Sequence, residues 1–376
     1  NIARAPLKGK FRMNLRIKSL DAILATAEKK SLKRSLGAFQ LTMLGIGGII
    51  GTGIFVLTAE AAQVAGPGML ISFVIAAVVC GLAALCYAEL AAMVPVAGSA
   101  YTYSYATFGE VLAWVVGWAL VLEYAVAGAA VAVGWSGYAV GVLDNLVGIR
   151  IPPEFANGPY AGGLINLPAV LVVALVTWLL VVGTKESATV NAVLVVVKVS
   201  ALIAFIALSV PAIQSEKFIP FAPLGTSGMI GAAAIIFFAF VGFDSVSTSA
   251  DVTINSKRNV PIGSLVICTI FYLLVGAGAI GSYGAQPLLD AAGIGYVPGS
   301  KEMTDACSAA TDSPLVCSNE ALAHVLRSIG HPAVGNMLGL AAGFALPSVV
   351  LMMLFAQTRV FFVMSRDGLL PTKLST

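Results

Sequence analysis

Two apolar segments of this sequence carry interruptions whose backbone could do chemistry. The first is GIGGIIGTG at residues 45–53, and the second is FFAFVGFDSVSTSADV at residues 237–252. Glycine weakens a helix by about 1 kcal/mol per residue relative to alanine, so five glycines in nine positions predict a helix break. Inside a membrane, non-helical backbone is tolerated only where it is buried in protein or lines a cavity. The freed N–H and C=O groups at both breaks are therefore predicted to bind a ligand.

Close helix packing is the alternative for the first interruption. Gly47 and Gly51 lie four residues apart, and such a small-xxx-small stripe by itself is typical of two helices in close contact. However, Gly45, Gly48 and Gly53 fall on other faces of the helix, and a second interrupted segment follows later in the chain. These two features favour an unwound helix over a packing stripe.

Charged side chains within the apolar segments form a second set of candidates. Lys198 lies in NAVLVVVKVSALIAFI and Glu123 lies in VVGWALVLEYAVAG. A charge at the bilayer centre costs about 2.5–3.5 kcal/mol on insertion, so each needs a partner or a function. Lys198 is therefore a candidate functional residue, and Glu123 is its candidate partner. The alternatives are snorkelling of Lys198 to the membrane surface and a local bond of Glu123 within its own bundle.

The elements that position these residues are transmembrane helices. Of the 376 residues, 59% are hydrophobic and 10% are charged, and the mean hydropathy is +0.94. These values differ strongly from those of soluble domains and predict a polytopic membrane protein. The apolar runs of spanning length lie near residues 39–65, 68–94, 111–143, 164–183, 190–213, 229–253, 262–284 and 333–364, which makes eight spans.

The two interruptions fall in the first and the sixth of these predicted spans. An odd period of five spans inverts the second copy relative to the first. Paired interruptions at corresponding positions of two inverted halves indicate the binding site of a transporter. The sequence thus predicts a transporter whose ligand binds at the two breaks.

Basic residues concentrate at the start of the chain. The first 36 residues contain ten lysines and arginines, which by the positive-inside rule place this segment in the cytoplasm. We therefore predict a basic cytoplasmic tail at 1–36 and one transmembrane domain at 37–376. Binding of the tail to nucleic acid or to anionic lipid is the alternative, and no nucleic-acid partner is expected. No cleavable signal peptide is predicted, because the first apolar run starts late and is too long.

Two cysteines bracket a polar segment within a long loop at about 285–332, which this topology places outside the cell. Cys307 and Cys317 lie in KEMTDACSAATDSPLVCSNEALAH. An oxidising compartment permits a disulfide between them, and two free thiols in a mobile loop are the alternative. The spacing of cysteines and histidines does not suit a metal, so no metal and no cofactor are predicted.

At these residues the sequence resembles the amino acid-polyamine-organocation transporters, in particular their bacterial cationic amino acid transporter branch. The similar stretches are LTMLGIGGIIGTGIFVLTA, LCYAELAAMVPVAGSAYTYSYATFGE, FFAFVGFDSVST and RVFFVMSRDGLLP, which are spread over nearly the whole chain. The resemblance implies an all-α polytopic membrane protein with a five-plus-five inverted-repeat, leucine-transporter-like fold. Such proteins have at least twelve spans, and the repeat needs ten. Only about eight apolar runs are found here, so the C-terminal spans of the fold are expected to be absent.

The resemblance also implies a coupling residue: the Lys198 amine would stand in for the cation of sodium-driven members, which makes Lys198 a proton-coupling residue with Glu123 as its partner.

The resemblance further assigns a substrate site. A substrate carboxylate would bind exposed amides at a half-helix N-terminus in the first break. The residues of this part are Gly48, Ile50, Thr52 and Gly53. The substrate ammonium would bind carbonyls around Phe237, Ala239 and Phe240, and Phe238 would close over the site as an aromatic gate. From the residues alone, core packing is the alternative for these phenylalanines and for Phe243.

Together these features predict a secondary active transporter that imports amino acids across the bacterial inner membrane by alternating access, in symport with protons. An uncoupled exchanger or a nutrient sensor with the same fold is the alternative. An enzyme is not expected, because the predicted spans lack histidine and lack a nucleophile–base cluster. The expected partners are an amino acid, protons and the lipid bilayer, with a small single-span accessory subunit or none. Whether the substrate is cationic or neutral stays open.

Overall fold

Helices account for nearly all regular structure in the part of the chain that the structure describes. The computed structural model describes residues 46, 49–93, 99–182, 188–242, 260–310, 314–371 and 373, and the basic segment 1–36 lies outside these ranges. Within them, β-structure is limited to an isolated bridge between Leu289 and Gly295. The prediction of an all-α polytopic membrane protein is confirmed.

The described helices follow the apolar runs of the sequence. By length and composition, five helical stretches of the described residues could cross a membrane: Leu57–Tyr87, Glu110–Val147, Val193–Ala212, Leu265–Tyr283 and Pro332–Arg366. Two shorter apolar helices, Leu167–Val182 and Gly225–Phe240, occupy the fourth and sixth predicted spans. Because 39–45 lies outside the described residues, the first predicted span is described mainly from its break onward.

Among the described residues, ten helical elements fall within the eight predicted spans. In chain order they are α3 (Thr52–Phe55), α4 (Leu57–Ala65), α5 (Met69–Met93), α7 (Glu110–Val142), α9 (Leu167–Val182), α10 (Ala188–Ser209), α11 (Gly225–Phe237), η6 (Phe238–Phe240), α13 (Val260–Tyr283) and α16 (Pro332–Arg366). Shorter helical turns connect them. These are η1 (Gly66–Gly68), α6 (Ser99–Thr107), η2 (Leu143–Val147), α8 (Pro153–Ala156), η3 (Pro159–Ala161), η4 (Val210–Ala212), η5 (Ser215–Phe218), α14 (Lys301–Ala309), η8 (Leu315–Cys317) and α15 (Ala321–Ser328).

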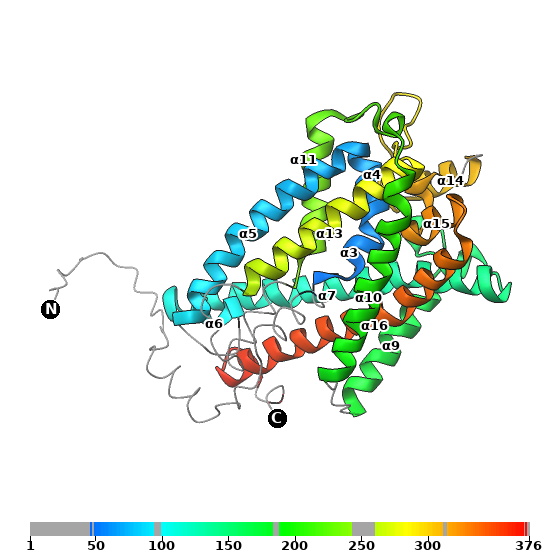
Figure 1. Cartoon of the computed structure of the whole chain (residues 1–376). Coiled ribbons are helices and arrows are strands. Elements are labelled where there is room, and N and C mark those ends of the chain that lie inside the picture. Colours follow the sequence, from blue (N-terminus) through cyan, green and yellow to red (C-terminus); the bar gives the residue numbers. More distant parts are fainter. Residues whose placement is uncertain are drawn as a thin grey trace.

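The spans pack as two groups that meet where α10 packs on α13 and where α3 contacts α7. Helices α4, α5, α11 and α13 form one group, in which α5 and α13 lie side by side, and α7, α9, α10 and α16 form the other (Figure 1). Spans that are five positions apart in the sequence pack as pairs: α4 on α11, α5 on α13, and α7 on α16. This pairing brings the first and sixth spans, which carry the two interruptions, into contact.

Small residues let the two longest spans lie close together. On α7, a Cβ at Gly117 would collide with the Met364 side chain of α16, whereas at Gly128 it would lie 3.7 Å from Cβ of Met353. The indole nitrogen of Trp135 donates a hydrogen bond of 2.7 Å to the carbonyl oxygen of Gly343. Close packing and this bond fix α7 against α16 next to the first break.

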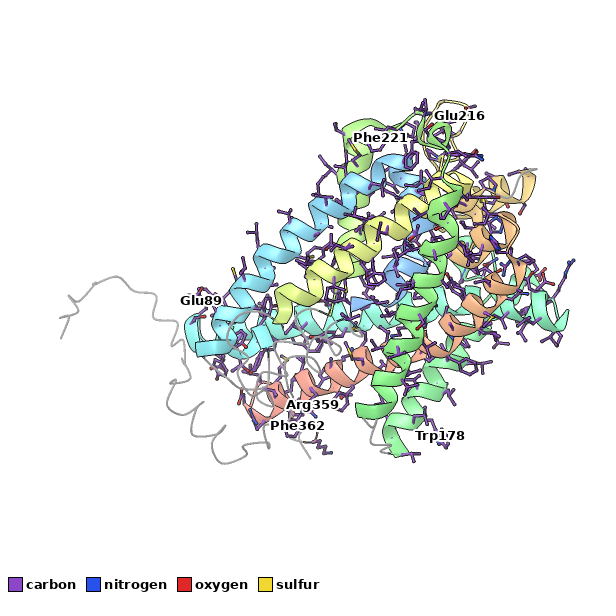
Figure 2. The ribbon with its side chains drawn as sticks, in the orientation of Figure 1. Glu89, Trp178, Glu216, Phe221, Arg359 and Phe362 are labelled. Carbon is purple, nitrogen blue, oxygen red and sulfur yellow. A yellow bond between two sulfur atoms is a disulfide. The ribbon has the colours of Figure 1, made fainter. Side chains whose placement is uncertain are left out.

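Apolar side chains cover the outside of the bundle. Figure 2 shows Trp178 and Phe362 projecting away from the helices, and their exposed fractions are 60% and 39%. The acidic Glu89 and Glu216 lie at opposite ends of the bundle in the same view. An apolar girdle with charged residues at both ends is what a bilayer requires of a helix bundle.

A helical cap closes one end of the bundle, within the segment 285–332 for which the sequence predicts a loop. The cap consists of α14, η8 and α15, and we call this end the capped end. Helix α15 buries the apolar side chains of Leu322, Val325 and Leu326 against the spans. With only eight residues, α15 is far too short to cross a membrane, and its sequence contains polar residues among the apolar ones. Burial of one face, and not overall apolarity, therefore makes this segment helical.

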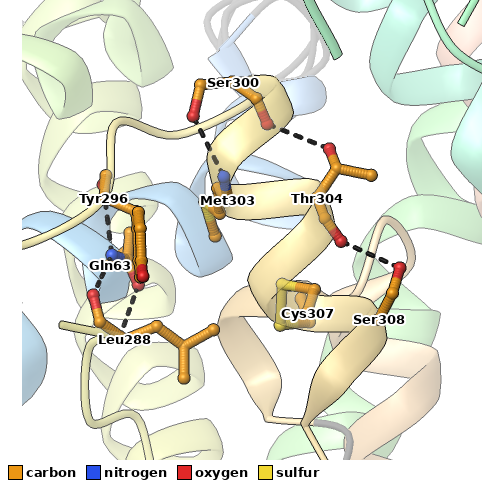
Figure 3. Close-up of a disulfide and its surroundings, with 9 residues drawn as sticks. Gln63, Leu288, Tyr296, Ser300, Met303, Thr304, Cys307 and Ser308 are labelled. Atoms are coloured by element: carbon orange, nitrogen blue, oxygen red, sulfur yellow. Dashed lines mark hydrogen bonds between the residues drawn. A yellow bond between two sulfur atoms is a disulfide. The ribbon is translucent and has the colours of Figure 1, made fainter. Parts of the chain in front are cut away.

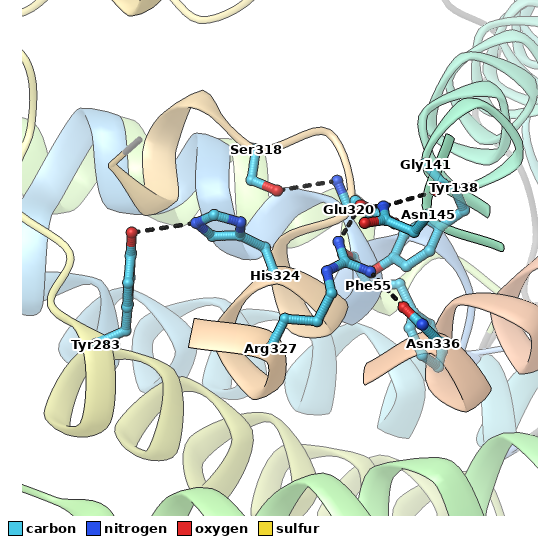
Figure 4. Close-up of polar contacts among 10 residues, drawn as sticks. All are labelled: Phe55, Tyr138, Gly141, Asn145, Tyr283, Ser318, Glu320, His324, Arg327 and Asn336. Carbon is cyan, nitrogen blue, oxygen red and sulfur yellow. Dashed lines mark hydrogen bonds and ion pairs between the residues drawn. The ribbon is translucent and has the colours of Figure 1, made fainter. Parts of the chain in front are cut away.

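Polar side chains tie α15 to two spans (Figure 4). Glu320, directly before α15, forms an ion pair with Arg327, and Arg327 donates a hydrogen bond of 3.3 Å to the amide oxygen of Asn336 on α16. A ring nitrogen of His324 lies 3.1 Å from the hydroxyl oxygen of Tyr283 on α13. Burial raises the pKa of Glu320 above its usual value, while the positive charge of Arg327 acts in the opposite direction.

A glutamine and a disulfide fasten the loops of the capped end (Figure 3). The buried Gln63 side chain of α4 donates to the backbone oxygens of Leu288 and Tyr296 at 2.8 and 3.1 Å, and it accepts from the Leu288 amide at 2.9 Å. Cys307 and Cys317 form a disulfide with their Cα atoms 5.5 Å apart. The connection between α13 and α16 is thereby anchored to the first span.

Replacing both Cys307 and Cys317 by alanine is expected to destabilise the capped end without disturbing the helix breaks. The disulfide joins cysteines ten positions apart. For a loop of this size, the constraint on the unfolded chain contributes about 2–3 kcal/mol. Thermal unfolding of the double variant should therefore occur at a lower temperature than that of the wild type. Mass spectrometry of a non-reduced digest provides the control, because two alkylatable thiols in the wild type would contradict the bridge.

Candidate functional site

The first break interrupts the first span at Ile50 and Gly51. Ile49 is helical, the next two residues form bends, and the helix resumes as α3 at Thr52. A Cβ at Gly51 would lie 3.3 Å from the side chain of Val349 on α16, so glycine lets the bend approach that helix. A break of this kind removes the helical hydrogen-bond partners from backbone groups on either side of it.

The second break interrupts the sixth span. Helix α11 ends at Phe237 and tightens into the 3-10 turn η6, in which the Val241 amide donates to the carbonyl oxygen of Phe238 at 3.2 Å. Gly242 follows with a φ of +118°, in a region that favours glycine. Both interruptions predicted from the sequence are therefore breaks in the structure.

The two breaks touch. A Cβ at Gly53 would collide with the backbone and the Cβ of Ala239, so only glycine permits this approach of α3 to η6. On another side, the hydroxyl oxygen of Tyr272 on α13 lies 2.8 Å from the carbonyl oxygen of Ile49 and 2.9 Å from that of Ala239. The backbone of the first break is therefore held directly against that of the second.

A small pocket lies between the breaks. Its described lining consists of residues from both breaks and of side chains from α7 and α16: Ile49, Gly51, Gly53, Val131, Phe238, Ala239, Val241, Val349 and Met353. All nine of these residues are uncharged. The pocket thus combines backbone polar groups at the breaks with an apolar wall made by Val131, Val349 and Met353.

Lys198 lies inside the bundle, beside this pocket. Its side chain is 2% exposed, and its Nζ lies 3.4 Å from the hydroxyl oxygen of Ser348 on α16. The Ser348 hydroxyl in turn donates to the carbonyl oxygen of Ala345 at 2.6 Å. Ser348 directly precedes the lining residue Val349, so the Lys198 amine lies inside the bundle, near the part of α16 that lines the pocket.

Glu123 is half-buried on α7. It precedes the lining residue Val131 by eight positions, which is about 12 Å along a helix at about 1.5 Å per residue. Its pairing with Lys198 stays a prediction.

The phenylalanines of the second break have three different environments. Phe238 lines the pocket together with Ala239. Phe240 is fully buried and packs against Tyr272. The side chain of Phe237 is 39% exposed and faces away from the core. Among these aromatic side chains, Phe238 is therefore the one placed where a gate would act.

The predicted site residues of the first break also differ in their surroundings. Gly53 lines the pocket, whereas Ile50 is fully buried in the core. Gly48 lies outside the described residues, as do the side chain of Thr52 and the whole of Phe243.

Two tyrosines at the breaks were not predicted as site residues. Tyr272 bridges the breaks, and the Tyr138 hydroxyl of α7 donates to the carbonyl oxygen of Phe55, at the end of α3, at 2.7 Å. Both side chains are fully buried. The signal in the sequence is a tyrosine within an apolar span, because a buried phenol needs a hydrogen-bond partner.

Two broken spans that meet at a pocket are typical of a membrane transport protein. The model of the amino acid permease family matches residues 36–376, and the chain belongs to this family. Its members are permeases, so the chain is a transporter and not an enzyme.

Relatives that are named for different substrates are similar to this chain. It is 45% identical over 362 residues to the branched-chain amino acid permease BcaP of Bacillus subtilis, covering 94% of this chain and 72% of the relative. It is 38% identical over 362 residues to the methylthioribose transporter of the same organism, covering 95% and 72%. It is also 34% identical over 370 residues to the human cationic amino acid transporter 4, covering 95% of this chain and 54% of the relative.

Proposed function

We propose that this protein carries neutral, aliphatic amino acids into the bacterial cell by alternating access, in symport with protons. The observation that carries this proposal is the uncharged pocket between two helix breaks. The higher identity to a branched-chain amino acid permease than to a cationic amino acid transporter supports the same substrate class.

The pocket supports separate binding of the three parts of an amino acid. Amides at Gly51 and Gly53, where the helix resumes, suit a carboxylate, because partial positive charge gathers at a helix start. Carbonyl oxygens at Ile49 and Ala239 suit an ammonium group. The substrate side chain would then lie against Val131 and the apolar side chains of α16.

A cationic side chain fits this pocket poorly. Burying a charge without a partner carries a large free-energy penalty, and the described lining offers no carboxylate to arginine or lysine. An aliphatic side chain would instead gain about 25 cal/mol for each Å² of apolar surface that it removes from water. This difference favours leucine, isoleucine and valine over the cationic amino acids.

The five-plus-five inverted repeat belongs to this proposal. The pairing of α4 with α11, α5 with α13, and α7 with α16 supports it, since these are spans five positions apart. Alternating access would follow from rocking of the group that contains the broken spans against the group formed by α7, α9, α10 and α16. We place the protein in the inner membrane. The basic residues of segment 1–36 support a position of that segment on the cytoplasmic side.

Proton coupling is proposed on the position of Lys198. Its Nζ lies 3.4 Å from Ser348, next to the pocket wall, so movement of α16 relative to α10 would change its surroundings. Binding of a proton in one state and its release in the other would link proton flow to amino acid uptake. An exchanger or a sensor of the same family would lack this link.

Uptake by the full-length protein in proteoliposomes tests the proposal. The panel consists of radiolabelled isoleucine, leucine, arginine and methylthioribose, each with and without an imposed proton gradient. We expect concentrative uptake of isoleucine and leucine only with the gradient. Uptake of arginine but not isoleucine would refute the substrate class, and exchange that ignores the gradient would refute the coupling.

Replacing Phe238 by alanine is expected to weaken closure of the site more than folding. The ring lines the pocket and is only partly buried, so its removal opens the site without leaving a cavity in the core. We expect a raised KM or an increased leak of isoleucine at normal expression. The matched variant Phe237→Ala removes an exposed ring from the neighbouring position and should leave both quantities unchanged. Wild-type KM and leak in Phe238→Ala would remove the gate assignment.

A further inference from the structure

Tyr272 of α13 joins the two helix breaks through one hydroxyl group. Its ring is fully buried, and the ring centroids of Phe240 and of Phe73 on α5 lie 5.1 and 5.7 Å from its own. These contacts hold the ring in place. The hydroxyl oxygen consequently stays within hydrogen-bond distance of two carbonyl oxygens, Ile49 at 2.8 Å and Ala239 at 2.9 Å.

The number of donors does not match the number of acceptors at this point. A tyrosine hydroxyl has one proton to donate, whereas each carbonyl oxygen can accept two hydrogen bonds. The phenol can therefore donate to Ile49 or to Ala239, but not to both at once. Two carbonyl oxygens held beside one phenol form a place where a second donor would be stabilised.

Ile49 and Ala239 both line the pocket, one from each break. We propose that Tyr272 is a positioning residue that holds these two carbonyls at a fixed spacing, so that the substrate ammonium shares them with the phenol proton. In the occupied site the phenol donates to one carbonyl and the ammonium donates to the other. This inference rests on the proposed amino acid transport and adds to it the residue that organises the ammonium side of the pocket.

Tyr138 provides a matched comparison. It is also fully buried, and its hydroxyl donates to a backbone carbonyl of the same broken span, that of Phe55, at 2.7 Å. Phe55 is absent from the described lining of the pocket, and the Tyr138 hydroxyl contacts a single break. Removal of either hydroxyl should affect folding to a similar degree, but only removal at Tyr272 should affect the ammonium subsite.

The experiment compares full-length wild type, Tyr272→Phe and Tyr138→Phe. Isoleucine KM and Vmax are measured in proteoliposomes, and the melting temperature is measured with and without saturating isoleucine. We expect both variants to melt slightly below the wild type without ligand. Tyr272→Phe should raise the KM about tenfold, the effect of losing one well-placed hydrogen bond, with Vmax largely retained and a smaller thermal shift on adding isoleucine. Tyr138→Phe should keep the wild-type KM.

Two results would contradict the positioning role of Tyr272, and a third would contradict the proposed transport function. A wild-type KM and thermal shift in Tyr272→Phe would overturn the positioning role while leaving the transport function intact. An equal rise of KM in both variants would overturn it too, because that result indicates general loosening. A wild type that neither binds nor transports any aliphatic amino acid would instead overturn the proposed function.

A second variant keeps the inference testable if Tyr272→Phe does not fold. Incorporating 3,5-difluorotyrosine at position 272 retains the hydroxyl and nearly the shape of the ring but changes the strength of the hydrogen-bond donor. The isoleucine KM should shift in this variant. A KM equal to that of the wild type would contradict the positioning role.

Discussion

Replacing Lys198 by methionine is expected to abolish accumulation of isoleucine against its gradient while the protein still folds and inserts. Methionine retains the length and the apolar stem of lysine, but it cannot bind a proton. The lysine is 2% exposed and lies beside Ser348 on α16, so its substitution removes a titratable group from the interior of the bundle. Downhill exchange of isoleucine should persist, because the uncharged pocket is unchanged.

The measurement is uptake into proteoliposomes with an imposed proton gradient, followed over a range of pH. Lys217→Met is the matched control, since Lys217 is an exposed lysine in η5 and its loss should leave accumulation intact. Concentrative, pH-dependent uptake in Lys198→Met would contradict the coupling role and leave the lysine as a packing residue.

Replacing Gly53 by alanine is expected to reduce transport strongly by forcing the two breaks apart. The added Cβ would collide with the Cα and Cβ of Ala239, and backbone cannot rotate away as a flexible side chain can. Overpacking of this kind costs about 1–3 kcal/mol, which corresponds to roughly a fivefold to 150-fold loss if all of it falls on substrate binding.

Gly343→Ala is the control for this substitution. Gly343 lies on α16, and a Cβ there would meet no atom within 4 Å outside its own helix, so the variant should transport at the wild-type rate. Isoleucine KM and thermal stability should be measured for both variants. If Gly53→Ala keeps the wild-type KM and stability, the close contact of the two breaks is not needed for binding.

Much of the fold could be predicted because transmembrane helices depend on long apolar runs. The structure places α7 and α16 within a few residues of the runs at 111–143 and 333–364. Helix α15 was not predicted, since its eight residues are helical through burial of one face against other spans, and such contacts cannot be read from a local window. The position of Glu320 and Arg327 depends on the same packing.

The two helix breaks of the candidate site could be predicted, because glycine content decides where the backbone leaves the helix. In the first break, Gly53 lies where a Cβ would collide with Ala239. In the second break, Gly242 has a positive φ, which favours glycine. The apolar wall was not predictable, because Val131 and Val349 are ordinary residues of apolar spans. They line the pocket only because α7 and α16 pack together beside the breaks.

A structure of the full-length protein with bound isoleucine tests the central claim most directly. We predict that the amino acid lies between the two breaks, with its carboxylate near the amides of Gly51 and Gly53. Its ammonium should lie near the carbonyl of Ala239, and its side chain against Val131 and Met353. Isoleucine bound elsewhere, with this pocket free of substrate, would contradict the account.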